Sequence, residues 1–280
     1  MLESESVSHQ GLVRKKNEDS FSNNLGAGLW VVADGVGGNG NGDVASQLAV
    51  QSVERKIRQG TDLVQAISEA NTALVEAVEN DECLMGMATT LVACQFSKGN
   101  RFKVAWVGDS RAYRLNQTGI AQITVDHNQA NKLFSLGLIA EGEVQTHAGQ
   151  HELTQALGVM TLDQIPVSQG ALEDTDYLLL CTDGLTGVIS DQEIYQTIIN
   201  ADSLSKACEC LLARVLAEGA PDNVTFSIIQ YQEGGASAKM AAQASYRLPF
   251  DAKPYLQHLN SRPMLLLLML LSMIIVFLFI

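Results

Sequence analysis

Short apolar runs recur along the first 231 residues and predict β-strands. They are rich in Val, Leu, Ile and aromatic residues, and each is bounded by residues that are common at turns. The runs cluster instead of alternating strictly with helices, so the pattern favours antiparallel sheets covered by helices. The five clearest runs are 28–34, 88–96, 101–108, 176–182 and 224–231.

Three other segments repeat apolar residues at steps of three and four, the spacing of a helix with one buried face. The clearest is 62–79, in which Leu63, Ile67 and Leu74 lie on one side. These helices provide the apolar faces that cover the predicted sheets. The other two segments are 50–57 and 204–218, the second followed by Gly219 as its expected C-cap.

The segment 264–280 carries no charge, and Ser272 is its only polar side chain. As a helix it would extend about 25 Å, close to the thickness of a hydrocarbon core. A buried core helix is the alternative, but such a helix normally keeps a polar stripe. Basic residues precede the segment and none follows it, so the positive-inside rule predicts a single-pass tail anchor with the preceding domain in the cytoplasm. The expected organisation is a globular domain at 1–232, a linker at 233–262 and a transmembrane segment at 263–280.

Charge and cysteine content narrow the classes of function. The formal net charge of −13 argues against a surface that binds nucleic acid, which would need clustered Lys and Arg. The five cysteines are odd in number and form no CxxC pair, so a zinc site of that type is not expected. Acidic residues therefore become the main candidates for chemistry.

Aspartates stand at sharp turns beside the predicted strands. Any one of them could simply form a turn, because Asp and Gly are common turn residues. Five such sites together predict something more: gathered carboxylates repel one another unless cations neutralise them, and an all-oxygen set suits Mg²⁺ or Mn²⁺. The sites are NED at 17–19, ADG at 33–35, GDS at 108–110, TDG at 182–184 and PDN at 221–223.

A longer series of motifs resembles the PP2C, or PPM, family of metal-dependent protein serine/threonine phosphatases, in the bacterial style. The family's order and approximate spacing are kept over residues 1–231. The resemblance implies an α+β fold, a four-layer α-β-β-α sandwich of two antiparallel sheets flanked by helices, with metal ions at one edge. The matching blocks are RKKNED at 14–19, VADGVGG at 32–38, GMATTLV at 86–92, VGDSRAYRL at 107–115, TVDHN at 124–128, LTQALG at 153–158, LLLCTDGLT at 178–186 and PDNVT at 221–225.

The resemblance also implies a role for each acidic residue. Asp34 would bridge two Mn²⁺ or Mg²⁺ ions, and Asp183 and Asp222 would complete the shell of one of them. Glu18 and the carbonyl of Gly35 would bind the other ion. Two further aspartates complete the expected site: Asp19 holding ligated water and Asp109 in a weaker third-metal site.

The mechanism implied by the resemblance is direct attack on phosphorus by a hydroxide that bridges the two metals. Arg14 would clamp the phosphoryl oxygens with its planar guanidinium, although a solvated surface arginine is the alternative. His127 is expected to be a structural turn histidine, with a substrate-side role as the alternative. The expected partners are phosphorylated proteins and a cognate Ser/Thr kinase with its substrates at the membrane.

Several positions depart from the family pattern. Val36 stands where some members have a histidine proposed as general acid, and Asn39 stands where bacterial members often have another. The variable flap, 131–151, and the residues after it have Ala148, Gln150 and Gln155 where relatives carry a proline and two arginines. The alternative function is a membrane-tethered pseudophosphatase that binds phosphoproteins without turnover. A hydrolase of small phosphoesters is the other alternative.

Overall fold

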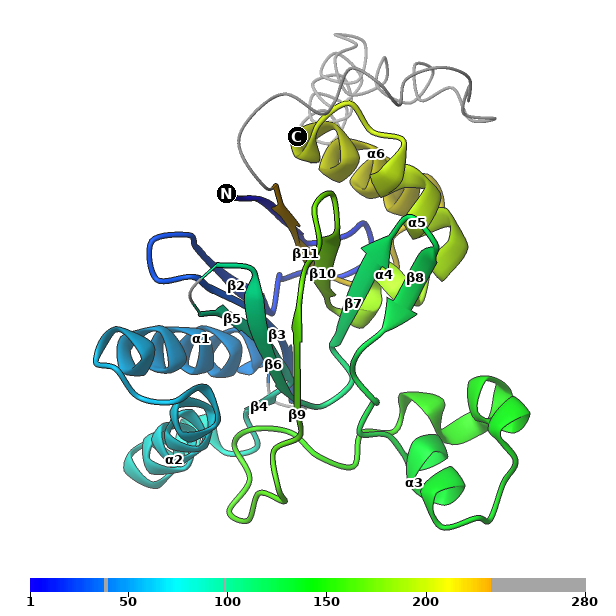
Figure 1. Cartoon of the computed structure of the whole chain (residues 1–280). Helices are drawn as coiled ribbons and strands as arrows, with labels where there is room; N and C mark the ends of the chain where they lie inside the picture. The colour runs from blue at the N-terminus through cyan, green and yellow to red at the C-terminus, as the bar shows by residue number, and fades with distance from the viewer. Residues whose placement is uncertain (38–39, 98, 233–280) are drawn as a thin grey trace, which may run out of the picture. The chain divides into compact units, whose positions relative to one another are not determined.

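Two antiparallel sheets form the centre of the computed structural model, which describes residues 1–37, 40–97 and 99–232 (Figure 1). The first sheet has the strand order β1-β11-β10-β7-β8, and the second has the order β2-β3-β5-β6-β9, with β4 paired to β3. The strands of the first sheet are β1 Leu2–His9, β11 Val224–Tyr231, β10 Tyr177–Cys181, β7 Arg111–Asn116 and β8 Gly119–Gln122. Those of the second are β2 Asp19–Asn24, β3 Leu29–Val36, β4 Ala88–Thr89, β5 Leu91–Phe96, β6 Arg101–Val107 and β9 Val167–Ala171.

The strand β3 shows why the central strands read as unbroken apolar runs. Successive side chains of a strand point to opposite faces. Trp30 and Val32 pack into the core between the sheets, whereas Val31 and Ala33 pack into a separate core beneath two helices. Both faces are therefore buried, and no polar alternation remains.

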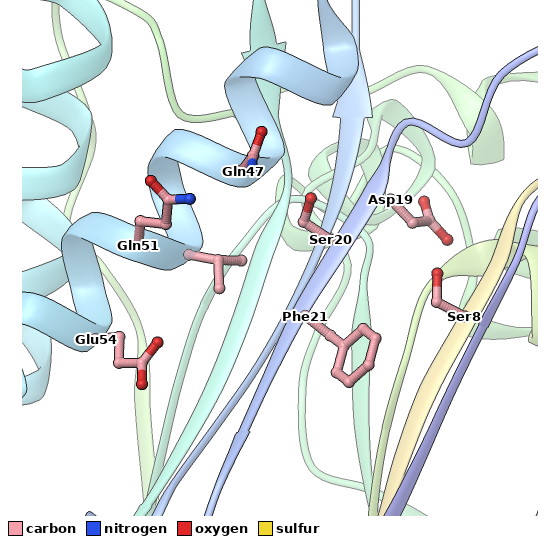
Figure 2. A pocket seen from close by; sticks show the side chains of 8 residues that line it. Ser8, Asp19, Ser20, Phe21, Gln47, Gln51 and Glu54 are labelled. Carbon is pink, nitrogen blue, oxygen red and sulfur yellow. The ribbon is translucent and has the colours of Figure 1, made fainter.

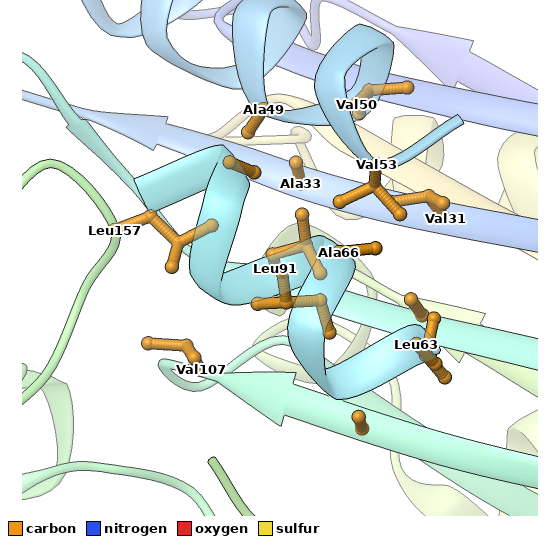
Figure 3. Packing of buried hydrophobic residues seen from close by; sticks show 14 of the residues in the cluster. Val31, Ala33, Ala49, Val50, Val53, Leu63, Ala66, Leu91, Val107 and Leu157 are labelled. Carbon is orange, nitrogen blue, oxygen red and sulfur yellow. The ribbon is translucent and has the colours of Figure 1, made fainter. Parts of the chain in front are cut away.

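Helices cover the outer face of each sheet, which gives four layers. Figure 3 shows Val53 and Ala66 packed over Val31 of β3. These side chains come from α1 (Gly42–Arg58) and α2 (Leu63–Asn80). On the first sheet, residues of α5 (Asp191–Ile199) and α6 (Leu204–Ala217) share a core with those of β10 and β11. The predicted fold of two antiparallel sheets flanked by helices is confirmed.

The helix and strand boundaries differ from the sequence-based ones in a few places. The helix α2 starts after Asp62, whose side chain caps it by accepting a hydrogen bond from the N–H of Val64 at 2.9 Å. The helix α1 begins at Gly42, several residues before its apolar stripe, and the run 88–96 is divided by Thr90 into β4 and β5. Pattern analysis did not predict β1, β2, β7, β8, β9 or α5.

The flap projects from the sheets as short helical segments: α3 Gln129–Ser135, η2 Glu141–Thr146 and η3 Ala148–His151 (Figure 1). Within the described residues, no helix is long and apolar enough to cross a bilayer. The predicted linker at 233–262 and transmembrane segment at 263–280 lie outside these residues. A further short helix, α4 Asp183–Thr186, follows β10, and the turn η1 Glu82–Leu84 follows α2.

Candidate functional site

The strand pair β2–β3 sets two aspartates directly opposite each other. Asp19 is the first residue of β2, and its register partner in β3 is Asp34. Thr90 fixes the main chain of Asp34 from the other side: its Oγ1 accepts from the Asp34 N–H at 3.0 Å, and its N–H donates to the Asp34 carbonyl at 2.8 Å. The main chain of Asp34 is therefore held in place by the sheet itself.

Gly35 sits where the main chain of three segments converges. Its N–H donates to the carbonyl of Glu18 at 3.1 Å. A Cβ at this position would lie 2.0 Å from the carbonyl oxygen of Gly42 and 2.5 Å from that of Glu18. Only glycine fits this approach, which brings the residues Glu18 and Asp34 to the same end of β3.

Two more aspartates reach this edge from the first sheet. Asp183 starts α4 two residues after the end of β10, and Asp222 lies two residues before the start of β11. Asp222 Oδ2 accepts from Arg14 Nη2 at 2.6 Å. The guanidinium of Arg14 also interacts electrostatically with Asp34 and Glu18. Arg14, the predicted phosphate clamp, is half-exposed and lies beside the acids, paired with Asp222.

Asn223 organises the loop that carries Arg14 and Glu18, a role that sequence analysis did not assign. Its Oδ1 accepts from the N–H of Glu18 at 2.8 Å, and its Nδ2 donates to the carbonyls of Gln10 and Lys16 at 2.8 and 2.9 Å. The side chain is buried, with 5% of its surface exposed. The available signal was its place directly after Asp222 in the PDN motif.

Asp109 follows β6 on a turn beside the flap. Gly108 before it has φ +101°, and a Cβ there would lie 2.6 Å from Cβ of Thr90. Two residues further along, Arg111 makes a forked ion pair with the buried Asp126, whose nearest contact is 2.7 Å. This pair, also missed from the sequence, ties β7 to the segment that leads into the flap.

Burial and mutual repulsion make the edge a poor place for unneutralised negative charge. Burial, with the charges of Asp183 and Asp222, raises the pKa of Asp19 to about 7. Burial and then Asp183 raise the pKa of Asp109 to about 7. The pKa of Asp34 is raised well above its usual value, by burial first and then by the surrounding carboxylates. Burial, followed by the charge of Asp222, also raises the pKa of Asp183.

The donor atoms fit a hard divalent cation. Asp19 Oδ1 and Asp183 Oδ1 are buried, and each lacks a hydrogen-bond partner among the described residues. Buried polar atoms are nearly always partnered, and carboxylate oxygens are the ligands that Mg²⁺ and Mn²⁺ prefer. Over the described ranges, no three Asp, Glu, His or Cys side chains converge into a preformed cage. The acids lie along the edge without forming a closed cage, and Arg14 pairs with Asp222.

Asp19 also lines a pocket of about 340 Å³ between the β-strands and α1 (Figure 2). Ser8 and Phe21 lie on the strand side, and Gln47 and Glu54 project from α1. The lining holds none of the other predicted site residues, so the pocket is not the reaction site. The acidic edge itself is the candidate active site.

Comparison with known proteins agrees with this geometry. Residues 8–220 match the family described as protein phosphatase 2C. The chain belongs to the protein phosphatase 2C family. It is 32% identical over 234 residues to the serine/threonine phosphatase Stp of Listeria welshimeri. This alignment covers 79% of this chain and 92% of that protein. It is 33% identical over 247 residues to the serine/threonine protein phosphatase PstP of Mycobacterium tuberculosis, covering 85% of this chain and 47% of that protein. The solved catalytic domain of PstP in complex with two manganese ions aligns with a TM-score of 0.72 at 33% identity, over 83% of this chain and 99% of that one.

The structure shows where the positions that depart from the protein phosphatase 2C pattern lie. Val36 ends β3, so no titratable side chain follows Gly35. In the flap, Ala148 and Gln150 belong to η3, and Gln155 Oε1 is buried without a partner among the described residues. Position 39 lies outside the described residues.

Proposed function

We propose that this protein is a metal-dependent phosphatase that hydrolyses phosphoserine and phosphothreonine in proteins. One observation carries the proposal: among the described residues, a buried carboxylate oxygen of Asp19 and one of Asp183 lack hydrogen-bond partners at the edge where Asp19 faces Asp34 across the β2–β3 pair. Protein phosphatase 2C membership supports the reaction class. A complete acidic set disfavours the pseudophosphatase, which normally lacks ligands.

Different carboxylates would bind different cations. Asp34 would bridge two Mn²⁺ or Mg²⁺ ions, with Asp183 and Asp222 on one and Glu18 and the Gly35 carbonyl on the other. Asp19 would hold coordinated water, and Asp109 would serve a weaker third ion. When bound, the ions supply Lewis-acid activation of the attacking water and neutralise charge on the phosphoryl group.

Arg14 binds and orients the phosphoryl group. It pairs with Asp222 at 2.6 Å and lies on an exposed loop, so its fork is at the surface of the acidic edge. A planar guanidinium matches two phosphoryl oxygens at once. Val36 cannot donate a proton, so the proton for the leaving alkoxide must come from another group.

The test is Mn²⁺-dependent phosphate release from a phosphothreonine peptide by the purified full chain in mild detergent. Asp34→Asn and Asp183→Asn should each abolish turnover, while Asp202→Asn, at an exposed position before α6, should not. Tight phosphopeptide binding without turnover by well-folded, Mn²⁺-loaded protein would establish the binding module instead. Equal turnover of free phosphometabolites would identify a small-phosphoester hydrolase.

A membrane anchor is part of the same proposal. The uncharged segment 264–280, preceded by Arg262, supports insertion with the phosphatase domain in the cytoplasm, where it opposes a Ser/Thr kinase. Flotation with lipid vesicles tests this. The full chain should float, and Leu268→Arg with Ile274→Arg should not, since each central arginine costs about 3 kcal/mol. Flotation of the doubly substituted chain would contradict the anchor.

A further inference from the structure

Two hydrogen bonds join His127 to the turn that carries Asp109. The N–H of Gly108 donates to His127 Nδ1 at 3.1 Å, and the N–H of His127 donates to the Gly108 carbonyl at 3.0 Å. Gly108 has φ +101° and packs against Thr90, so this turn has little freedom to change shape. The imidazole therefore reaches across 19 residues of sequence to the peptide immediately before Asp109.

The same residue stands where the two ends of the flap meet. The His127 carbonyl accepts from the N–H of Thr154 at 2.8 Å. The next residue, Asn128, donates through Nδ2 to the carbonyl of Gln150 at 2.8 Å, and its Oδ1 caps α3. The two ends of the flap are therefore hydrogen-bonded at His127 and Asn128.

The ring of His127 is held as a neutral acceptor. It stacks on Trp106 with centroids 6.5 Å apart and an interplanar angle of 25°. Trp106 Nε1 in turn donates to the carbonyl of Val125 at 2.9 Å. Burial lowers the pKa of His127, which favours the neutral ring whose Nδ1 lone pair receives the Gly108 N–H.

We infer that His127 is a positioning residue that joins the base of the flap to the Gly108–Asp109 turn, so that the flap and the Asp109 carboxylate keep one relative geometry. This inference rests on the proposed function, in which Asp109 serves the weaker third cation. A purely local turn histidine would have its imidazole bonded within its own turn, as His147 has: its Nδ1 accepts from Gly149 N–H at 3.0 Å. His127 instead bonds to a turn 19 residues away in sequence, the one that carries Asp109.

Two substitutions separate the acceptor from the ring. His127→Phe keeps a flat ring beside Trp106 and removes the acceptor, whereas His127→Asn removes the ring and keeps an oxygen near the place of Nδ1. The first measurement is amide hydrogen exchange of Gly108 in the full chain, without any metal. We expect about tenfold faster exchange in His127→Phe and near wild-type exchange in His127→Asn.

The second measurement is Mn²⁺ binding by titration calorimetry, together with the Mn²⁺ half-saturation of turnover. His127→Phe should weaken the Asp109-dependent ion by about tenfold, the effect of one hydrogen bond, with His127→Asn near wild type. In the double variant with Asp109→Asn, the His127→Phe effect on this ion should disappear, because it acts through that carboxylate. His147→Phe, the matched control within the flap, should change neither readout.

Equal behaviour of the Phe and Asn variants, or an equal effect of His147→Phe, would overturn the inference. The Asn variant alone remains decisive when the Phe variant unfolds, since loss of Gly108 protection in His127→Asn would show that the acceptor does not hold the turn. The proposed function would instead be refuted if the wild type showed no turnover or if Asp34→Asn were fully active. The hydrogen-exchange result would still test the bond between His127 and Gly108, because it is measured without metal.

Discussion

Asp19 faces Asp34 directly across the β2–β3 ladder. Residues opposite each other in an antiparallel pair have side chains on the same face, and like charges there are destabilising. Thr182 relieves part of this by donating from Oγ1 to Asp19 Oδ2 at 3.0 Å, but Asp19 Oδ1 stays unpartnered among the described residues. The fold therefore concentrates negative charge where divalent cations are expected to bind.

Asp34→Asn should reduce Mn²⁺-dependent turnover by at least about 100-fold, because loss of a shared cation ligand removes several kcal/mol of transition-state stabilisation. The same change should raise the unfolding temperature of the chelator-treated protein by relieving repulsion with Asp19. Turnover assays and thermal denaturation measure the two effects. A fall in both activity and stability would indicate a general folding defect.

Asp109→Asn should stabilise the metal-free protein more at pH 8 than at pH 5. The folded-state pKa of Asp109 is about 7 against an ordinary value of 3.8, so the folded state binds more protons between these values and loses stability as pH rises through them. The gain in unfolding temperature at pH 8 should be several degrees, since a shift of this size corresponds to at most roughly 4 kcal/mol once both states are ionised. A gain of the same size at both pH values would contradict the raised pKa.

Gly35→Ala should destabilise the protein by about 3 kcal/mol or more and abolish turnover, since the added Cβ would meet the carbonyls of Gly42 and Glu18. Gly142→Ala is the matched control, because a Cβ there meets nothing within 4 Å. Its effect should stay within about 0.5 kcal/mol. Denaturant unfolding compares the two, and equal stabilities would show that the close approach at Gly35 is relaxed in solution.

Asn223→Ala should cost about 2–3 kcal/mol of folding stability, because three hydrogen bonds to the loop that carries Arg14 are lost. The KM for a phosphopeptide should also rise as that loop loosens. Asn200→Ala is the control, since the Asn200 amide bonds to Gln196 one helical turn back and is far from this loop in sequence. An unchanged KM in a destabilised Asn223→Ala protein would limit its role to folding.

Arg14→Lys should raise the KM for a phosphopeptide by about tenfold and affect kcat less, because lysine keeps the charge but not the two-pronged geometry. Arg101→Lys, at an exposed position in β6, should leave both constants unchanged. Steady-state kinetics at saturating Mn²⁺ provides the measurement. A KM equal to that of the wild type would remove Arg14 from phosphate recognition.

Sequence patterns predicted the elements whose buried residues form an unbroken run or a continuous stripe. The strands β3 and β11 are mostly apolar and almost wholly buried, and α2 has one continuous apolar stripe, so each was evident locally. The strand β2 reads DSFSNN, in which Phe21 is the only apolar residue and is 38% exposed. It becomes a strand through its pairing with β3, a constraint that local propensity does not contain.

For the site, the motifs identified the acidic residues and the arginine but not the side chains that position them. Asn223 and Thr182 belong to recognised motifs, but the sequence predicted no role for either of them. Their roles depend on contacts with segments more than 150 residues away in sequence, such as the bond from Thr182 to Asp19. Spacing along the chain carries no information about such distances.

The sequence by itself determined which residues bring carboxylate chemistry, which segments have apolar faces to bury, and which family the chain resembles, because these are properties of residue type and order. The tertiary structure decided that Asp19 opposes Asp34, that Arg14 neutralises Asp222, and that His127 receives the Gly108 N–H. It also decided which carboxylates lose water and have raised pKa values. Register, burial and electrostatic interaction depend on distances between segments far apart in the chain, and only the packing of the two sheets sets those distances.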